Sequence, residues 1–325
     1  MLIEVRNLRI LITGGAGFIG SHLCDHYVKK KATVLCLDNF LNGDLLNIRH
    51  LLGHRNFKLI KGDVTDYDII EKNARDVDVI FHLAAQIHVD RSIVEPRFTY
   101  DVNVKGTQNI LEAARILDVD KTIFASSSEV YGTAEYVPMD ENHPLNSPHP
   151  YGASKIAADR MCSAYMATYG MNVVIMRSFN TYGPRQKDTG YGGAISIFIK
   201  RAMNNIPPII YGDGNQTRDY TYIEDIVDAY DLVLRTKSNI KSPINFGTGS
   251  EIRIIDLANK ILEKCECNVA PVHIEPRPGE VMRMVADSSL AREMGWKPRY
   301  SIDQGLTKLI EWYKHYGAER WIKMG

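Results

Sequence analysis

The chain has 325 residues, 45% hydrophobic and 24% charged, which is the usual balance of a soluble globular protein with one or two domains. Lysine plus arginine equals aspartate plus glutamate at 39 each, so no overall charge attracts nucleic acid or a membrane, and any anionic ligand needs a local site. The sequence has no apolar signal segment and no run approaching about 20 apolar residues, which favours a cytoplasmic protein without membrane partners.

The first predicted element is a short buried strand over residues 8–12, apolar on both faces like a central strand of a parallel sheet. It leads into a glycine turn and then a helix, and Gly14, Gly17 and Gly20 give the turn G-x-x-G-x-x-G spacing. The first glycine permits a tight turn, the second lets a pyrophosphate approach the backbone, and the third lets the helix pack closely on the strand. The turn therefore predicts a dinucleotide site.

The next predicted strand, residues 33–37, ends at Asp38. An acidic side chain about 20 residues after the turn accepts hydrogen bonds from the adenosine ribose hydroxyls and repels a ribose phosphate. NAD is therefore favoured over NADP. The alternative is a structural glycine turn with a capping aspartate.

Strands and helices continue to alternate through the first half of the chain. Further strands are predicted over residues 57–61, 79–83, 122–125 and 172–177, and helices over residues 96–117 and 151–169. Alternation at this pace predicts an α/β fold with a doubly wound, Rossmann-like parallel sheet, which binds its ligands beyond the carboxyl ends of the strands. The polar loop over residues 136–150 is expected to cover the active site, with surface decoration as the alternative.

Beyond residue 177 the predicted elements are shorter. They are helices over residues 194–204 and 225–236, strands over 209–211, 244–246 and 272–274, a hairpin turn at 212–214, and two more helices within 252–325. The strand at 244–246 is expected to rejoin the main sheet. We therefore expect an NAD-binding domain over residues 1–180 with a return near 212–250, and a smaller, interleaved substrate-binding lobe over 181–211 and 251–325.

Five cysteines are scattered along the chain, and only Cys265 and Cys267 lie close together. No second pair or histidine cluster completes a zinc site with them. We therefore expect reduced thiols and no metal.

Tyr151 and Lys155 lie four residues apart in a predicted helix, so both side chains point into the same space. A free tyrosine loses its proton near pH ~10, and a neighbouring positive charge favours the phenolate. The lysine, with an oxidised nicotinamide also close, is therefore expected to bring the phenol into the range of a useful base. Ser127 and Glu129 follow the preceding strand and are expected to face the same space.

Together these residues resemble the extended short-chain dehydrogenase/reductase family, in particular its nucleotide-sugar epimerases and dehydratases, over essentially the whole chain. The shared marks are the glycine turn, Asp38, Asp63-Val64, His82-Leu83-Ala84-Ala85, Asn103, Ser127, Tyr151 with Lys155, Asn180, Tyr182-Gly183-Pro184-Arg185 and Arg218-Asp219. The resemblance implies bound NAD and a nucleotide-diphosphate sugar as substrate.

The resemblance also implies which residues contact the cofactor. Asp63 is expected near the adenine amine, and Asn103 is expected to support the active-site helix. The expected cofactor-binding residues are Gly14, Gly17, Phe18, Ile19, Asp38, Asn39, Asp63, Val64, Leu83, Ala84, Ala85, Asn103, Tyr151 and Lys155.

Catalytic roles follow from the same resemblance. Tyr151 would take the proton from a sugar 4-hydroxyl as hydride passes from that carbon to NAD⁺. Lys155 would hold the nicotinamide ribose and lower the pKa of the tyrosine. Ser127 would hydrogen-bond the same sugar oxygen and help to relay the proton.

For the substrate, Asn180 and Arg218 resemble pyrophosphate ligands of a sugar nucleotide, and Arg277 resembles a second cation there. The arginine fork suits phosphate oxygens. For either arginine the alternative is a surface salt bridge. The expected substrate-binding residues are His88, Ser128, Asn180, Tyr211, Arg218 and Arg277.

Glu129 bears most on the reaction that follows the oxidation. Once sugar C4 is a ketone, the hydrogen at C5 is acidic, and a carboxylate that removes it allows water to leave from C6. A 4-epimerase needs no such base, and galactose epimerases carry an uncharged residue at the position of Glu129, whereas dehydratases carry glutamate. The alternative for Glu129 is a carboxylate that satisfies backbone donors at the start of a helix.

Ser128 departs from the pattern. The run over residues 88–93 closely resembles that of dTDP-glucose 4,6-dehydratases, but those enzymes have, in place of Ser128, an aspartate that protonates the leaving hydroxyl. Serine is not an acid of similar strength. GDP-mannose 4,6-dehydratases and the bacterial dehydratases of legionaminic-acid biosynthesis also resemble the chain around Glu129, and UDP-glucuronate decarboxylases share its serine–glutamate pair.

The leading prediction is an NAD-dependent nucleotide-sugar 4,6-dehydratase with the catalytic residues Ser127, Glu129, Tyr151 and Lys155. The alternatives are a nucleotide-sugar 4-epimerase, a UDP-glucuronate-type decarboxylase, and a non-catalytic protein that senses NAD. The helices over residues 96–117 and 151–169 carry apolar residues on more than one face, and the resemblance implies that they form a homodimer contact.

Overall fold

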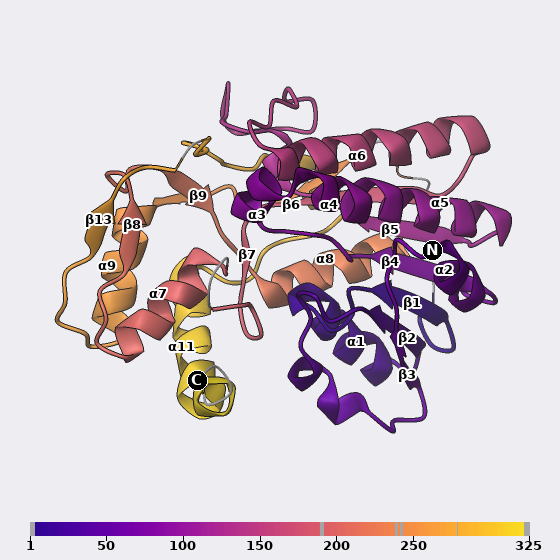
Figure 1. Ribbon diagram of the computed structural model, residues 1–325, viewed down its shortest axis with the longest axis horizontal. Helices are drawn as coiled ribbons and strands as arrows, with labels where there is room; N and C mark the ends of the chain where they lie inside the picture. The colour runs from indigo at the N-terminus through magenta and orange to yellow at the C-terminus, as the bar shows by residue number, and fades with distance from the viewer. Residues whose placement is uncertain (1–3, 189–191, 238–239, 241–242, 278, 322–325) are drawn as a thin grey trace.

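A parallel sheet of seven strands forms the centre of the computed structural model, which describes residues 4–188, 192–237, 240, 243–277 and 279–321 (Figure 1). From edge to edge its strands are β11 (Ile244–Phe246), β6 (Val173–Ser178), β5 (Lys121–Ala125), β4 (Val79–His82), β1 (Arg9–Thr13), β2 (Thr33–Asp38) and β3 (Phe57–Lys61). The chain winds from β1 to β3, returns to β4 on the other side of β1, and then winds the opposite way. This is the doubly wound, Rossmann-like sheet that the sequence predicts, and its direction reverses between β1 and β4, where such folds bind ligands.

Helices cover both faces of the sheet (Figure 1). One face carries α2 (Tyr67–Ala74), α3 (Val89–Val94), α4 (Pro96–Tyr100), α5 (Gly106–Ile116) and α6 (Pro150–Tyr169). The other face carries α1 (Phe18–Lys29) and α8 (Ile223–Arg235). Short helical turns are η1 (Leu45–Asn47), η2 (Arg49–Leu51), η3 (Asp101–Lys105) and η4 (Ser128–Val130).

Strand β1 shows how the sequence separates the two faces. Ile10 and Ile12 belong to the core that includes α1 and α8, whereas Leu11 belongs to the core that includes α2 and α5. Successive side chains of a strand point to opposite faces, so a strand that is apolar at every position must be covered on both. On the α1 side, Tyr27 stacks on Phe81 with 5.1 Å between the ring centroids.

The second half of the chain adds small two-stranded sheets beside the main one. They pair β7 (Thr181–Tyr182) with β10 (Thr221–Tyr222), β9 (Thr217–Asp219) with β12 (Glu251–Arg253), and β8 (Ile209–Tyr211) with β13 (Val272–Ile274). The accompanying helices are α7 (Ala194–Met203), α9 (Ile254–Lys264), α10 (Ser289–Glu293) and α11 (Ile302–Trp321).

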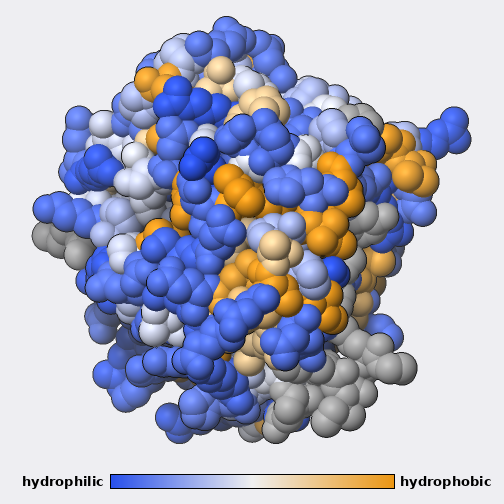
Figure 2. All heavy atoms as spheres, turned by 90° about the vertical axis from the view of Figure 1, so that its left-hand side faces the viewer, coloured by the Kyte–Doolittle hydropathy of each residue, from blue (hydrophilic) through white to orange (hydrophobic). Residues whose placement is uncertain are grey.

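We call α7, β8, α9 and β13 the outer end of the molecule, because they lie together at the left of Figure 1. Seen from that side, apolar side chains gather in the middle of the face and hydrophilic ones surround them (Figure 2). On β13, Val272 is 46% exposed and Ile274 is 41% exposed.

Some local expectations differ from the structure. The predicted helix over residues 96–117 contains a π turn, η3, between α4 and α5. The hairpin predicted at 212–214 is wrong, because β8 pairs in parallel with β13 and not with the strand that follows it. The segment after residue 252 contains α9, α10 and α11 where two helices were expected, since α10 is only five residues long. The strand β11 rejoins the main sheet beside β6, as predicted, while the division into two domains stays a prediction.

Within the described ranges, no helix is both long and apolar enough to cross a bilayer. The same ranges hold no group of three or more His, Cys, Asp or Glu side chains placed to bind a metal ion.

Candidate active site

A cavity of about 800 Å³ lies beyond the carboxyl ends of the central strands. Its walls come from the glycine turn, the loop after β2, the loop after β4, the segment after β5 and the start of α6. It lies at the reversal of the strand order, where an open α/β sheet binds its ligand.

Most of the expected cofactor-binding residues line this cavity. They are Gly14, Gly17, Phe18, Ile19, Asp38, Asn39, Val64, Leu83, Ala84, Ala85, Tyr151 and Lys155.

The glycine turn leaves room only for glycine at its first position. Gly14 has φ +69°, and a Cβ there would lie 2.8 Å from the backbone nitrogen of Ala84. A Cβ on Gly20 would lie 2.2 Å from the carbonyl oxygen of Gly14. The turn therefore brings the start of α1, with its unpaired backbone N–H groups, against the cavity.

Asp38 ends β2 and shapes the next part of the wall. Its Oδ2 accepts a hydrogen bond from the backbone N–H of Ala16 at 2.9 Å, and its Oδ1 accepts one from Phe40 at 2.8 Å. Burial raises the pKa of this carboxyl, and the two backbone hydrogen bonds act against that rise. The loop closes tightly around it, since a Cβ on Gly43 would lie 2.7 Å from Oδ1.

Asp63 and Asn103 do not line the cavity. Asp63 accepts hydrogen bonds from Asn39 at 2.7 Å and from Thr65 at 2.8 Å. Contact of either residue with a cofactor stays a prediction.

Asn103 instead joins two walls of the site. Its Oδ1 accepts a hydrogen bond from the backbone N–H of Gln86 at 2.8 Å. Its Nδ2 donates to the backbone carbonyl oxygen of Gln86 and to Ser154 Oγ, both at 2.9 Å. Ser154 lies in α6, between Tyr151 and Lys155. The π turn that carries Asn103 therefore fixes the active-site helix to the loop after β4.

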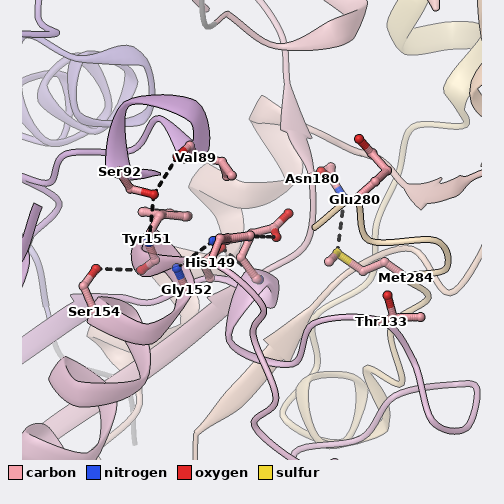
Figure 3. Close-up of polar contacts among 12 residues, drawn as sticks. Val89, Ser92, Thr133, His149, Tyr151, Gly152, Ser154, Asn180, Glu280 and Met284 are labelled. Carbon is pink, nitrogen blue, oxygen red and sulfur yellow. Dashed lines mark hydrogen bonds and ion pairs between the residues drawn. The ribbon is translucent and has the colours of Figure 1, made fainter. Parts of the chain in front are cut away.

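The expected catalytic residues come together at one end of the cavity, which Ser127, Glu129, Tyr151 and Lys155 all line. Ser127 caps η4, just after β5, and the other wall is the first turns of α6. The backbone N–H of Tyr151 donates to Ser92 Oγ at 3.0 Å, which fixes the start of α6 (Figure 3).

The pKa of Tyr151 depends on its burial and on two neighbouring side chains. Burial raises the pKa of Tyr151 to about 12, the hydrogen bond with Ser127 lowers it, and the charge of Glu129 raises it. The Nζ of Lys155 donates to the Ala125 carbonyl at 2.7 Å. Burial lowers the pKa of Lys155 itself to about 8.

Glu129 is held as a carboxylate. Burial raises its pKa, but the hydrogen bond with His149 and the charges of Arg218 and His149 outweigh burial and bring the pKa below its ordinary value. His149 Nε2 lies 3.1 Å from Glu129 Oε2. A partly buried carboxylate, 20% exposed, that stays ionised in a cavity wall is available to accept a proton.

The expected substrate-binding residues divide into two groups. Ser128, His88 and Asn180 line the cavity. Ser128 is buried, His88 Nε2 lies 2.9 Å from Asn42 Oδ1, and Asn180 donates to the sulfur of Met284 at 3.6 Å (Figure 3).

Tyr211, Arg218 and Arg277 lie outside the cavity lining. Arg218 pairs with Glu280 at 2.9 Å, and Arg277 stacks on Tyr211 with its guanidinium 3.8 Å from the ring centroid. Arg277 also lies 3.9 Å from Asp90, so each arginine has a carboxylate partner, as the salt-bridge alternative expects, and their contact with phosphate stays a prediction.

Sequence reasoning missed His149 and Ser92, which both act on the start of α6. Helix caps are usually Ser, Thr, Asp or Asn, so a histidine before Pro150 gives little signal. Ser92 lies within the run of residues 88–93, but its partner Tyr151 is 59 residues away in the sequence.

Comparison with known proteins gives a family match over most of the chain. The family model described as GDP-mannose 4,6 dehydratase matches residues 11–309. A protein of Methanocaldococcus jannaschii named putative UDP-glucose 4-epimerase is 41% identical over 308 residues, which cover 94% of this chain and 98% of the relative.

Two further relatives carry names of other reactions. UDP-glucuronic acid decarboxylase 1 of Xenopus tropicalis is 34% identical, with 96% of this chain and 74% of the relative covered. The structure of DesIV, a dTDP-glucose 4,6-dehydratase of Streptomyces venezuelae with NAD and TYD bound, has a TM-score of 0.90 and 30% identity, covering 96% of this chain and 98% of that one. Proteins of three named reactions are therefore similar to this chain.

Proposed function

The chain belongs to the family of nucleotide-sugar epimerases and dehydratases that the GDP-mannose 4,6 dehydratase model describes, and within it we propose an NAD-dependent nucleotide-sugar 4,6-dehydratase. The observation that carries this proposal is the Glu129 carboxylate, which lines the cavity together with Tyr151 and Ser127. Oxidation at sugar C4 needs NAD as the hydride acceptor and one base, a role that Tyr151 fills with the help of Ser127. Removal of a hydrogen from C5 needs a second base, and Glu129 supplies one.

The residues of the cavity fit NAD. The start of α1 offers backbone N–H groups to the pyrophosphate, and Asp38 offers a carboxylate to the adenosine ribose. Lys155 is placed to hold the nicotinamide ribose. When bound, NAD takes a hydride from sugar C4 and later returns it to C6.

Tyr151 and Ser127 act on the 4-hydroxyl. Tyr151 takes its proton, and Ser127 holds the same oxygen and relays the proton. The hydrogen bond between the two side chains lowers the pKa of the phenol, against the effect of burial. The serine therefore favours the proton transfer as well as positioning the sugar.

Glu129 acts on the resulting 4-ketone. It takes the acidic hydrogen of C5, the C6–O bond breaks, a C5=C6 double bond forms, and the C6 hydroxyl leaves as water. Ser128 is a weak acid, so we assign the proton for the leaving hydroxyl to Glu129 itself, which has just received one from C5. Return of the hydride to C6 and uptake of a proton from solvent at C5 would then give the 4-keto-6-deoxy sugar, while Tyr151 releases to solvent the proton of the 4-hydroxyl; no net oxidant is used.

A 4-epimerase is the second candidate, and the similarity to a putative UDP-glucose 4-epimerase favours it. That reaction needs Tyr151 and Ser127 but gives Glu129 no role. A decarboxylase would need a sugar that carries a carboxyl group at C5.

The test is incubation of the protein and NAD with UDP-, GDP- and dTDP-hexoses in deuterium oxide, followed by NMR of the products. We expect a 4-keto-6-deoxy sugar nucleotide with deuterium at C5. An epimer that keeps its C5 hydrogen from every substrate would overturn the proposal in favour of epimerisation.

A further inference from the structure

His149 occupies the N-cap of α6, and its side chain has two partners. Its Nδ1 accepts the backbone N–H of Gly152 at 3.1 Å (Figure 3), and its Nε2 lies 3.1 Å from Glu129 Oε2. The side chain is only 3% exposed. One imidazole therefore joins the start of the active-site helix to the carboxylate on the opposite wall.

The contact with Gly152 fixes the tautomer of His149. A backbone N–H can only donate, so Nδ1 must present its lone pair to Gly152 and carries no hydrogen. In the neutral imidazole the hydrogen is then on Nε2, which points at Glu129. The neutral imidazole of His149 is therefore a hydrogen-bond donor to the carboxylate.

The packing around Gly152 holds this arrangement in place. A Cβ on Gly152 would lie 1.8 Å from Ser147 Oγ and 2.7 Å from the carbonyl oxygen of Glu129. The segment before His149 and the backbone of Glu129 thus both pack closely against Gly152. The ring of His149 also stacks on Tyr151, with 6.0 Å between centroids and 15° between planes.

A helix cap alone does not require histidine, because serine or asparagine accepts the same backbone hydrogen bond. Only the longer imidazole has a second nitrogen on its far side. That nitrogen engages Oε2 of Glu129, and among the described residues no hydrogen bond engages Oε1.

We infer that His149 is a positioning residue for Glu129: its Nε2–H holds one carboxylate oxygen and thereby presents the other to the sugar. This inference rests on the proposed function, in which Glu129 is the base for the C5 hydrogen. His149 itself does not line the cavity and takes no proton from the sugar.

The test compares His149→Asn with His149→Ala in the NAD-bound enzyme. Asparagine keeps the cap but cannot also reach Glu129, whereas alanine loses both contacts. We expect His149→Asn to melt closer to the wild type than His149→Ala does, and to slow deuterium exchange at C5 by about 10- to 100-fold, because a carboxylate that is no longer held in position loses part of the effect of a general base. The loss should appear in kcat and not in KM.

The pH dependence of kcat separates a positioning role of His149 from a role as helix cap alone, because loss of a cap would not change it. The charged and titratable groups facing Glu129 are His149 and Tyr151 from α6 and Arg218 from β9, and Arg218 is paired with Glu280. Without the hydrogen-bond donor of His149, the ionised form of Glu129 is less stable relative to its neutral acid, so its pKa rises. The acidic limb of the kcat profile should therefore move to higher pH. Titration of ¹³C-labelled glutamate, assigned with Glu129→Gln, should move the same way without any substrate.

His143→Asn is the matched control, because His143 is a buried histidine in the same loop that bonds the backbone of Glu135. It should leave the C5 exchange and the acidic limb unchanged. If His149→Asn exchanges C5 as fast as the wild type with an unmoved acidic limb, His149 is a helix cap and the inference is wrong.

Failure of the proposed function gives a different result. In that case the wild type itself exchanges no C5 hydrogen with any sugar nucleotide. The glutamate titration then decides on His149: an unchanged titration in His149→Asn overturns the inference, and a titration moved to higher pH supports the hold of His149 on the carboxylate while overturning the role of Glu129 as the C5 base.

Discussion

The Glu129 side chain is subject to opposing influences. Burial favours its neutral acid, whereas His149 and Arg218 favour its ionised form and prevail. Keeping a charge in a buried position costs free energy unless partners stabilise it, and here the partners are present. An ionised carboxylate beside a phenol also opposes ionisation of the phenol, which is seen at Tyr151. Both candidate reactions begin with proton transfer to Tyr151, so this effect acts on each of them, whereas the second ionised group is used only by the proposed dehydratase.

The first prediction concerns this carboxylate. Glu129→Gln should still let the sugar reduce bound NAD⁺ but should slow formation of the 4-keto-6-deoxy product by about 100-fold or more, the contribution of a positioned general base. Absorbance of the reduced nicotinamide and product NMR measure the two steps separately. Glu95→Gln, a 49% exposed glutamate, is the control and should behave as the wild type. Full dehydratase turnover in Glu129→Gln would exclude the role proposed for Glu129.

For single residues, the sequence predicted which residue types line the site and their order in the chain, but not the side chains and backbone groups that each one contacts. The spacing of Tyr151 and Lys155 places both side chains in the cavity. It could not predict that the Nζ of Lys155 donates to the Ala125 carbonyl, or that Ser127 and Glu129 shift the pKa of the Tyr151 phenol. Nor could it predict the partners of Arg218 and Arg277, since Glu280 and Tyr211 come from distant parts of the sequence.

Among the elements, the strands of the main sheet were the most predictable. The strand expected over residues 57–61 coincides with β3. The strands expected over residues 33–37 and 79–83 differ from β2 and β4 by one residue at the carboxyl end. Buried parallel strands are short apolar runs, so composition alone marks them. The pairing of β8 with β13 and the π turn at Asn103 depend on contacts across the fold, so local sequence carried no sign of either.

The second prediction concerns the packing of α1 on α8. Asp231 of α8 pairs with Lys30 at 2.7 Å and His26 at 3.1 Å, and its carboxylate is 13% exposed. Burial raises its pKa, but these partners outweigh burial and lower the pKa from 3.8 to about 2. Because the folded pKa lies below the unfolded value, the stabilisation is complete above about pH 4 and is lost as pH falls towards 2.

Asp231→Asn should therefore lower the free energy of unfolding by about 1–2 kcal/mol at pH 6 and by less at pH 3. Urea unfolding at the two pH values measures the difference. Asp76→Asn, at an exposed aspartate, should change neither value. An equal loss at both pH values would mean that the ion pair does not stabilise the helix contact.

At the scale of the whole molecule, the third prediction is a homodimer. The side of the sheet covered by α4, α5 and α6 exposes large side chains, with Tyr100 at 40%, Ile116 at 55% and Tyr169 at 53%. Burial of such side chains against a second copy releases water from apolar surface. Sedimentation should therefore show a dimer, and Ile116→Glu should shift it towards monomer. Leu52→Glu, at a 46% exposed leucine outside these helices, should not. A wild type that stays monomeric at all concentrations would contradict the prediction.

The outer end has a consequence for how the protein is made. Strand β8 must wait for β13, which begins 63 residues after β8 starts, whereas β1 to β6 are complete by residue 178. During synthesis, the nascent chain can therefore assemble most of the nucleotide crevice while the outer end still lacks its strand partner. Until β13 has been synthesised, the edge of β8 is open to pairing with other chains, so stalled or truncated products would expose an unpaired strand there.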